Sequence, residues 1–123
     1  MRSRRLRVTI NVLARKRARH GWQLTYEYEA EATSVPGPQL RRAAGVLSAL
    51  GYEARFVDDE NIVQIRYAPA KDSGADWDAE LTSGKYSTIL EVFRGTKAQR
   101  TSLRNNLEDA LARVGHAVSL GEI

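Results

Sequence analysis

Basic side chains are the residues of this sequence whose type and spacing most clearly indicate chemistry. Residues 1–20 hold eight basic side chains and no acidic one. Four of the eight form a tight cluster: Arg15, Lys16, Arg17 and Arg19. Cations that repel one another favour contact with phosphates, whose neutralisation releases counterions. The cluster therefore predicts binding to nucleic acid or to another acidic partner, although a basic run is also common in solvated loops.

Two further basic groups stand where helices are expected to begin. Arg41 and Arg42 come soon after Pro38, and three more cations have the spacing i, i+3 and i+7, which places them on one helical face: Lys97, Arg100 and Arg104. Cations near a helix N-terminus oppose the macrodipole, and a bound anion would relieve that mismatch. Placement on a solvated face is the simpler explanation, because arginine is abundant throughout the chain. The candidate phosphate-binding residues are thus Arg15, Lys16, Arg17, Arg19, Arg41, Arg42, Lys97, Arg100 and Arg104.

Motifs for catalysis do not emerge from the sequence. It has no cysteine, which excludes a thiol nucleophile, thiolate zinc and a disulfide scaffold. Gly84-Lys85 lacks the upstream glycine of a phosphate-binding loop, and no GxGxxG, HExxH or GxSxG occurs. The two histidines, His20 and His116, have no spacing that indicates a catalytic or metal-binding pair. We therefore expect a non-enzymatic protein without cofactor or metal.

An irregular acidic segment spans residues 69–85. If its second half is extended, Asp76, Asp78 and Glu80 share one face and Trp77 lies on the other, where it would anchor the segment on the core. Carboxylates could hold calcium or magnesium, but their spacing does not fit an EF-hand loop. A solvated acidic edge that discourages strand aggregation is the better interpretation.

The N-terminal third is predicted to form a long hairpin. Apolar and polar residues alternate over Leu6–Val12 and again over Trp22–Thr33, and the basic cluster lies at the tip between them. The register that aligns the two apolar faces sets Arg7 opposite Glu29 and Arg5 opposite Glu31. Opposite charges at facing positions stabilise a ladder by roughly 0.2–1 kcal/mol each. This interpretation makes Arg5 and Arg7 internal partners of the glutamates.

The remaining elements are marked by glycine, proline and capping residues. One helix is expected from Pro38 to a stop at Gly51, and a second from the capping box of Thr96 and Gln99 to a stop at Gly115. The expected strands are residues 52–57, 62–68, 86–94 and 116–120.

These elements predict an α+β fold: a two-layer sandwich in which two helices cover one face of a mixed or mostly antiparallel sheet. The 123 residues fit one domain over 1–123. The order of elements suggests a duplicated strand-strand-helix-strand unit, with half-repeats at about 4–57 and 62–120. No apolar run approaches the roughly 20 residues of a membrane span, so we expect a soluble, cytoplasmic protein.

The functional expectation is a small nucleic-acid-associated binding or accessory protein that contacts phosphates through the basic hairpin tip. The alternative is a protein-interaction or regulatory module that forms homo-oligomers, whose affinity would survive high salt. A third class is a small-ligand sensor with Trp22, Tyr26 and Tyr28 around a cleft, although these aromatics also fit a plain core.

Overall fold

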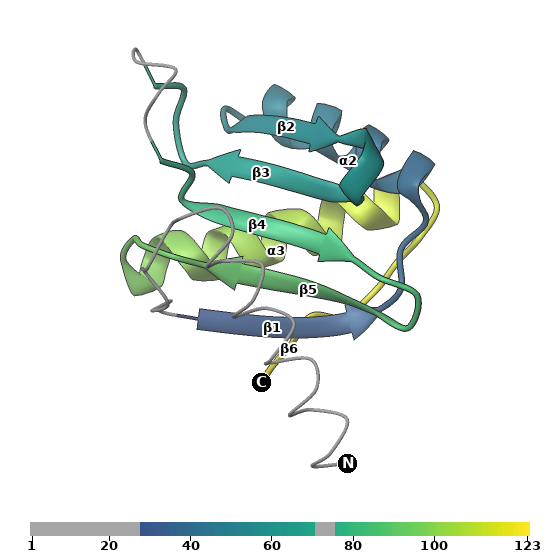
Figure 1. Cartoon of the computed structure of the whole chain (residues 1–123). Coiled ribbons are helices and arrows are strands. Elements are labelled where there is room, and N and C mark those ends of the chain that lie inside the picture. Colours follow the sequence, from purple (N-terminus) through teal and green to yellow (C-terminus); the bar gives the residue numbers. More distant parts are fainter. Residues whose placement is uncertain (1–27, 71–75) are drawn as a thin grey trace.

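A single antiparallel sheet carries two helices on one face (Figure 1). The computed structural model describes residues 28–70 and 76–123. In chain order its elements are β1 (Tyr28–Thr33), α2 (Gly37–Ala49), β2 (Glu53–Val57), the short 3-10 helix η1 (Asp58–Glu60), β3 (Ile62–Arg66), β4 (Ala79–Ser83), β5 (Ser87–Val92), α3 (Lys97–Arg113) and β6 (Gly121–Glu122). The strands lie in the order β2-β3-β4-β5-β1-β6, and each neighbouring pair is antiparallel. The expected α+β two-layer sandwich is confirmed.

Both helices end in the way that their glycines predict. After α2, the Gly51 N–H donates to the Ser48 carbonyl and the Tyr52 N–H to the Leu47 carbonyl, with Gly51 at a φ of 105°. The same pair of bonds closes α3, where Gly115 has a φ of 85°. This Schellman arrangement needs a left-handed residue just beyond the helix, a conformation that costs glycine little.

The core fills the space between the helices and the sheet. Each helix contributes a stripe of small and branched apolar side chains, and the strands contribute every second residue: Leu40, Ala43, Ala44, Leu47, Leu103, Leu107, Ala110 and Leu111 face Ala30, Val63, Ile65, Ala79, Leu81, Leu90 and Val92. Burying each of the larger side chains stabilises the fold by about 1.5–3 kcal/mol. Within the described residues, neither helix is long and apolar enough to cross a bilayer.

The predicted register of the N-terminal hairpin is wrong at Glu29 and Glu31. In the sheet, Glu29 lies opposite Glu91 and Glu31 opposite Ile89 on β5, while β6 occupies the other edge of β1. A strand has only two edges, so Glu29 and Glu31 cannot also pair with the strand around Arg5 and Arg7. Those two arginines, and the first strand of the expected duplication, lie outside the described residues. The duplicated unit is therefore not established.

The final strand also differs from the expectation. Residues 116–120 form no strand, and the ladder with β1 begins only at Gly121. Backbone donors of this stretch are taken by α3: the His116 N–H bonds the Leu111 carbonyl, and the Leu120 N–H bonds the Glu108 carboxylate at 2.7 Å. The stretch therefore runs along α3 before it reaches the sheet.

The acidic segment contains a central strand rather than a solvated edge. β4 lies between β3 and β5, and the side chain of Glu80 is only 1% exposed. Trp77 does anchor the segment, but on Arg66, whose guanidinium carbon lies 3.9 Å from the ring centroid, and not on the hydrophobic core. The sequence predicted no strand over residues 79–83, and in β4 the side chains of Ala79 and Leu81 are buried against the helices.

The capping box at the start of α3 allows the contribution of a helix cap to stability to be tested. The Thr96 hydroxyl accepts the Gln99 N–H at 3.1 Å, and the Gln99 side chain accepts the Thr96 N–H at 2.8 Å. We expect Thr96→Ala to lower the free energy of unfolding by about 1 kcal/mol. Urea denaturation measures this. Thr101→Ala, on an exposed part of the same helix, is the matched control, and an equal loss in both variants would contradict the capping role.

Candidate functional site

The predicted basic residues of the two helices lie at opposite ends of the helical layer. Leu50, which ends α2, and Gln99, in the first turns of α3, line the same hollow, while His116 after α3 contacts the carbonyl of Ser34 before α2. The helices are therefore antiparallel. Because α2 has 13 residues, its start lies roughly 20 Å from the start of α3. Arg15, Lys16, Arg17 and Arg19 lie outside the described residues.

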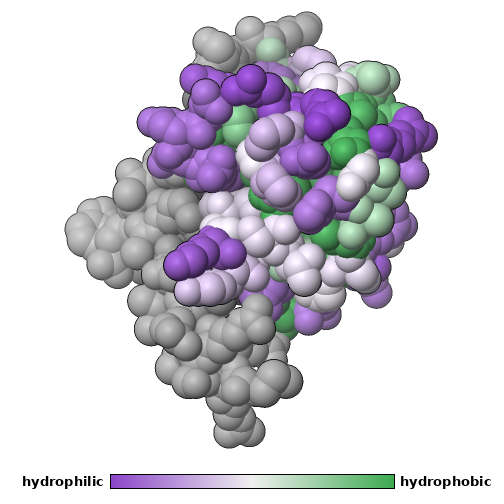
Figure 2. Space-filling model, turned by 90° about the vertical axis from the view of Figure 1, so that its right-hand side faces the viewer, coloured by the Kyte–Doolittle hydropathy of each residue, from purple (hydrophilic) through white to green (hydrophobic). Residues whose placement is uncertain are grey.

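At the start of α2, the arginines form part of an ordinary charged surface. Arg41 Nη2 lies 2.9 Å from Asp58 Oδ1, and the Arg41 guanidinium lies 5.3 Å from the centroid of the Phe56 ring. Arg41 and Asp58 are both largely exposed, so their ion pair contributes at most about 1 kcal/mol. Arg42 is exposed beside them. Figure 2 faces this end of the sandwich, where the described side chains are mostly hydrophilic and the hydrophobic ones gather toward the helices.

At the start of α3, two cations hold the first described residue of the sheet. Arg104 Nη1 donates to Tyr28 Oη at 3.1 Å, and the Arg100 guanidinium lies 5.2 Å from the centroid of the same ring. Arg100 and Arg104 are half-buried, whereas Lys97 is exposed. Tyr28 packs against the core with its other side. Residues 1–27 consequently join the sheet directly beside the cations of α3.

The face of the sheet that points away from the helices, here called the outer face, carries a row of acidic residues that the sequence did not reveal as a group. Glu29 on β1 lies opposite Glu91 on β5, and Glu91 lies opposite Glu80 on β4. These three residues are the glutamate row. Facing side chains start about 4.5–5.5 Å apart, and like charges at such positions destabilise a ladder. Glu80 and Glu91 are each 1% exposed, so the row holds acidic groups at a buried, closely spaced position.

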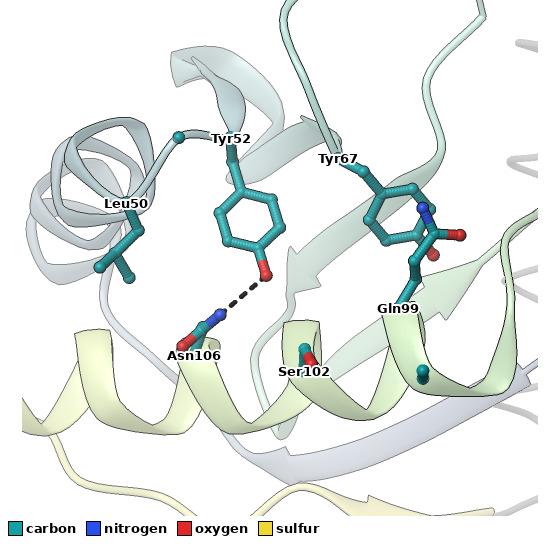
Figure 3. Close-up of a pocket in the computed structure, with 8 residues that line it drawn as sticks. Leu50, Tyr52, Tyr67, Gln99, Ser102 and Asn106 are labelled. Atoms are coloured by element: carbon teal, nitrogen blue, oxygen red, sulfur yellow. Dashed lines mark hydrogen bonds between the residues drawn. The ribbon is translucent and has the colours of Figure 1, made fainter.

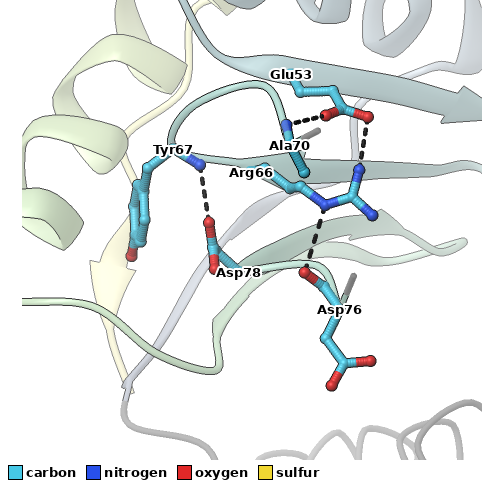
Figure 4. A network of polar contacts seen from close by, with 6 residues as sticks. All are labelled: Glu53, Arg66, Tyr67, Ala70, Asp76 and Asp78. Atoms are coloured by element: carbon cyan, nitrogen blue, oxygen red, sulfur yellow. Dashed lines mark hydrogen bonds and ion pairs between the residues drawn. The ribbon is translucent and has the colours of Figure 1, made fainter. Parts of the chain in front are cut away.

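A second charged arrangement on the outer face surrounds Arg66, whose side chain is 5% exposed (Figure 4). Its Nη1 lies 2.6 Å from Glu53 Oε2, its Nε donates to the Asp76 carbonyl at 3.4 Å, and its guanidinium covers the Trp77 ring. Glu53 Oε1 accepts the Ala70 N–H at 3.0 Å. The bond from Ala70, with a further contribution from Arg66, lowers the pKa of Glu53 below its ordinary value of 4.5.

The carboxylates of the acidic segment serve the connection between β3 and β4. Asp78 Oδ2 accepts the Tyr67 N–H at 2.9 Å, and Arg94 lies 3.7 Å from Asp76 and 3.8 Å from Asp78. In the described part of the chain, no three acidic or histidine side chains come together in a way that could hold a metal ion. These groups therefore hold a turn in place.

An open hollow lies between the end of α2, the start of α3 and the two tyrosines Tyr52 and Tyr67 (Figure 3). Its volume is about 390 Å³, and its lining residues are Leu50, Gly51, Tyr52, Tyr67, Ala98, Gln99, Ser102 and Asn106. Asn106 Nδ2 donates to Tyr52 Oη at 2.8 Å, and Tyr67 Oη donates to the Arg94 carbonyl at 2.7 Å. The first bond joins two walls of the hollow, and the second fixes the Tyr67 ring at its rim. Its lining has hydroxyl and amide groups but no carboxylate or imidazole.

The histidines and aromatics singled out in the sequence have separate places. His116 Nε2 lies 3.0 Å from the Ser34 carbonyl, where it links the end of α3 to the end of β1. His20, Trp22 and Tyr26 lie outside the described residues. Tyr28 is the only one of the three predicted cleft aromatics that the structure describes, and it lies beneath Arg100 and away from the hollow.

Comparison of the chain with protein-family models, with curated proteins and with solved structures finds no significant match.

The lowered pKa of Glu53 predicts how the stability of the protein changes with pH. A carboxyl whose pKa is lower in the folded state than in the unfolded state stabilises the fold above its ordinary pKa, and this contribution disappears as pH falls through the folded value. We expect Glu53→Gln to lower the urea midpoint at pH 7, and the difference from the parent chain to shrink as the pH falls below about 4.5. Asp59→Asn, at an exposed position of η1, is the control. A difference that stays constant with pH would contradict the role of Glu53.

Proposed function

We propose that this protein is a non-enzymatic, nucleic-acid-associated binding or accessory protein. Its phosphate-binding surface combines the basic cluster Arg15, Lys16, Arg17 and Arg19 with Lys97, Arg100 and Arg104 at the start of α3. The observation that carries the proposal is the contact of Arg100 and Arg104 with Tyr28, because it puts the point where residues 1–27 join the sheet beside the cations of α3.

Chain length keeps the two basic groups within reach of one extended ligand. Tyr28 comes nine positions after Arg19, and even a fully extended chain covers no more than about 3.5 Å per residue, or roughly 30 Å. A nucleic acid strand easily spans such a distance, since a duplex carries a phosphate charge about every 1.7 Å of its axis. A small anion would contact only one of the groups.

The charge distribution favours a nucleic acid over an acidic protein as the ligand. The basic side chains of residues 1–20 are concentrated in a short stretch without acidic neighbours, whereas the rest of the chain is net acidic. Such a local concentration of cations gains affinity from counterion release along a polyanion. Contacts of this kind are made with the phosphate backbone of the nucleic acid, so we expect weak sequence selectivity.

The α2 arginines lie outside the proposed surface. Arg41 and Arg42 begin roughly a helix length away from α3, and Arg41 already pairs with Asp58. Arg41 and Arg42 therefore serve as controls for the effect of net charge on binding.

A salt titration of binding tests the proposal. Fluorescence anisotropy with single- and double-stranded DNA and RNA should show that the logarithm of the association constant falls linearly with the logarithm of salt concentration, with a slope of roughly 0.7–0.9 per neutralised phosphate. Replacing Arg15, Lys16, Arg17 and Arg19 by Ser should reduce the slope by about 3 and leave the melting temperature nearly unchanged.

A matched pair of double variants separates local contact from net charge. Lys97→Gln/Arg100→Gln and Arg41→Gln/Arg42→Gln each remove two positive charges. We expect the first to reduce the salt slope by about 2 and the second to leave it nearly unchanged. Equal losses in both would indicate an effect of net charge alone. Absence of binding at low salt would overturn the proposal, and partner affinity that survives high salt would favour a protein-interaction module.

A further inference from the structure

We propose that the outer face of the sheet is the docking surface for the chain's own N-terminal segment, residues 2–12. The segment would place arginine side chains on the glutamate row and apolar side chains on the row beside it. This inference goes beyond the proposed function, because it concerns residues 2–12 and the fold itself, whereas phosphate binding is assigned to residues 15–19 and α3.

Charge is the first argument for this occupant. On the outer face, the strand residues with charged side chains are five glutamates and two arginines: Glu29, Glu31, Glu53, Glu80, Glu91, Arg55 and Arg66. One of the arginines is already paired, since Arg66 holds Glu53. Residues 2–12 carry four arginines and no acidic residue: Arg2, Arg4, Arg5 and Arg7. Buried carboxylates are stable as charged groups only when cations lie close to them.

The second argument comes from the row next to the glutamates, which is apolar. Ile89, Thr82 and Ile62 lie side by side on β5, β4 and β3, at facing register positions. All three are at most 6% exposed, although both helices lie on the other face of the sheet (Figure 1). In the described part of the chain, the Thr82 hydroxyl has no hydrogen-bond partner. A buried hydroxyl without a partner costs about 1–3 kcal/mol, so this position points to a covering segment with a polar group.

The sequence of the segment suits such a two-row surface. Its arginines lie within residues 2–7 and its large apolar side chains, Leu6, Val8, Ile10 and Val12, within residues 6–12, so cations and apolar side chains come in the same short stretch. The way into the surface is also short, because residue 27 precedes Tyr28 at the start of β1 and Glu29 is the first member of the glutamate row. Covering the apolar row would contribute about 25 cal/mol per Å² of apolar area.

Because the chain has no cysteine, a single introduced thiol reports whether the outer face is covered. Thr82→Cys places the thiol in the apolar row, and Gly45→Cys places it on the exposed side of α2, where an added side chain meets nothing within 4 Å. The reagent is iodoacetamide, which is uncharged. In the full chain at low salt we expect Thr82→Cys to react at least about tenfold more slowly than Gly45→Cys, as expected when exposure requires a local opening.

The deciding measurement repeats the two reactions after Arg2, Arg4, Arg5 and Arg7 are replaced by Gln. We expect the Thr82→Cys rate to rise about tenfold and the Gly45→Cys rate to stay unchanged. Loss of nearby cations would by itself raise the pKa of the thiol and slow its reaction. An increase therefore reports uncovering. Gln64→Cys, at the half-buried position opposite Glu80, repeats the test if the Thr82 variant does not fold.

Each other outcome contradicts the proposal. Equal rates for the two thiols in the unaltered chain would show that the face is open. A slow Thr82→Cys rate that does not change after the arginine replacements would show that another element covers the outer face. A Thr82→Cys rate that falls with increasing protein concentration would assign the covering segment to a second copy of the chain. No nucleic acid enters these reactions, so their result is independent of the proposed phosphate binding.

Discussion

The position of β1 between β5 and β6 is the constraint on which the rest of the molecule depends. Its pairing with β5 puts Ala30 beside Leu90 in the core and, on the opposite face, Glu29 beside Glu91. The same ladder brings Tyr28 under the cations of α3. The β1–β5 register thus determines three features: the core, the glutamate row and the place where the basic segment joins the sheet. A shift of one residue would exchange the two faces of β1 and bury its glutamates in the core.

The outer face shows two ways to accommodate charge in a sheet. The Arg66 guanidinium contacts a carboxylate, a backbone carbonyl and an aromatic ring. Its charge is therefore balanced by groups close to the β2–β3 pair. The glutamate row instead extends over three strands, and like charges at facing positions oppose its formation. The core on the other side of the sheet stabilises the register that brings these three glutamates together.

Local patterns allowed most elements to be predicted, and long-range pairing accounts for the errors. Glycine stops and the capping box at Thr96 mark the helices because those signals act within a few residues. The sequence could not show that Glu29, Glu80 and Glu91 meet, since they come from strands distant along the chain. The facing charges of Arg7 and Glu29 favoured a local hairpin, but the edges of β1 pair with β5 and β6. Of the candidate site, the grouping of Lys97 with two arginines was predictable from helical spacing, whereas their contact with Tyr28 was not.

The sheet order also has a consequence for the way in which the chain acquires its structure. Both neighbours of β1 come from the last third of the sequence, with Glu31 opposite Ile89 on one side and Gly121 on the other. During synthesis, β2, β3 and β4 can pair with their sequence neighbours early, but β1 has no edge to join until β5 has left the ribosome. Closing such long loops slows folding. For most of its synthesis β1 is therefore without a neighbouring strand, and unpaired strand edges are prone to non-native association.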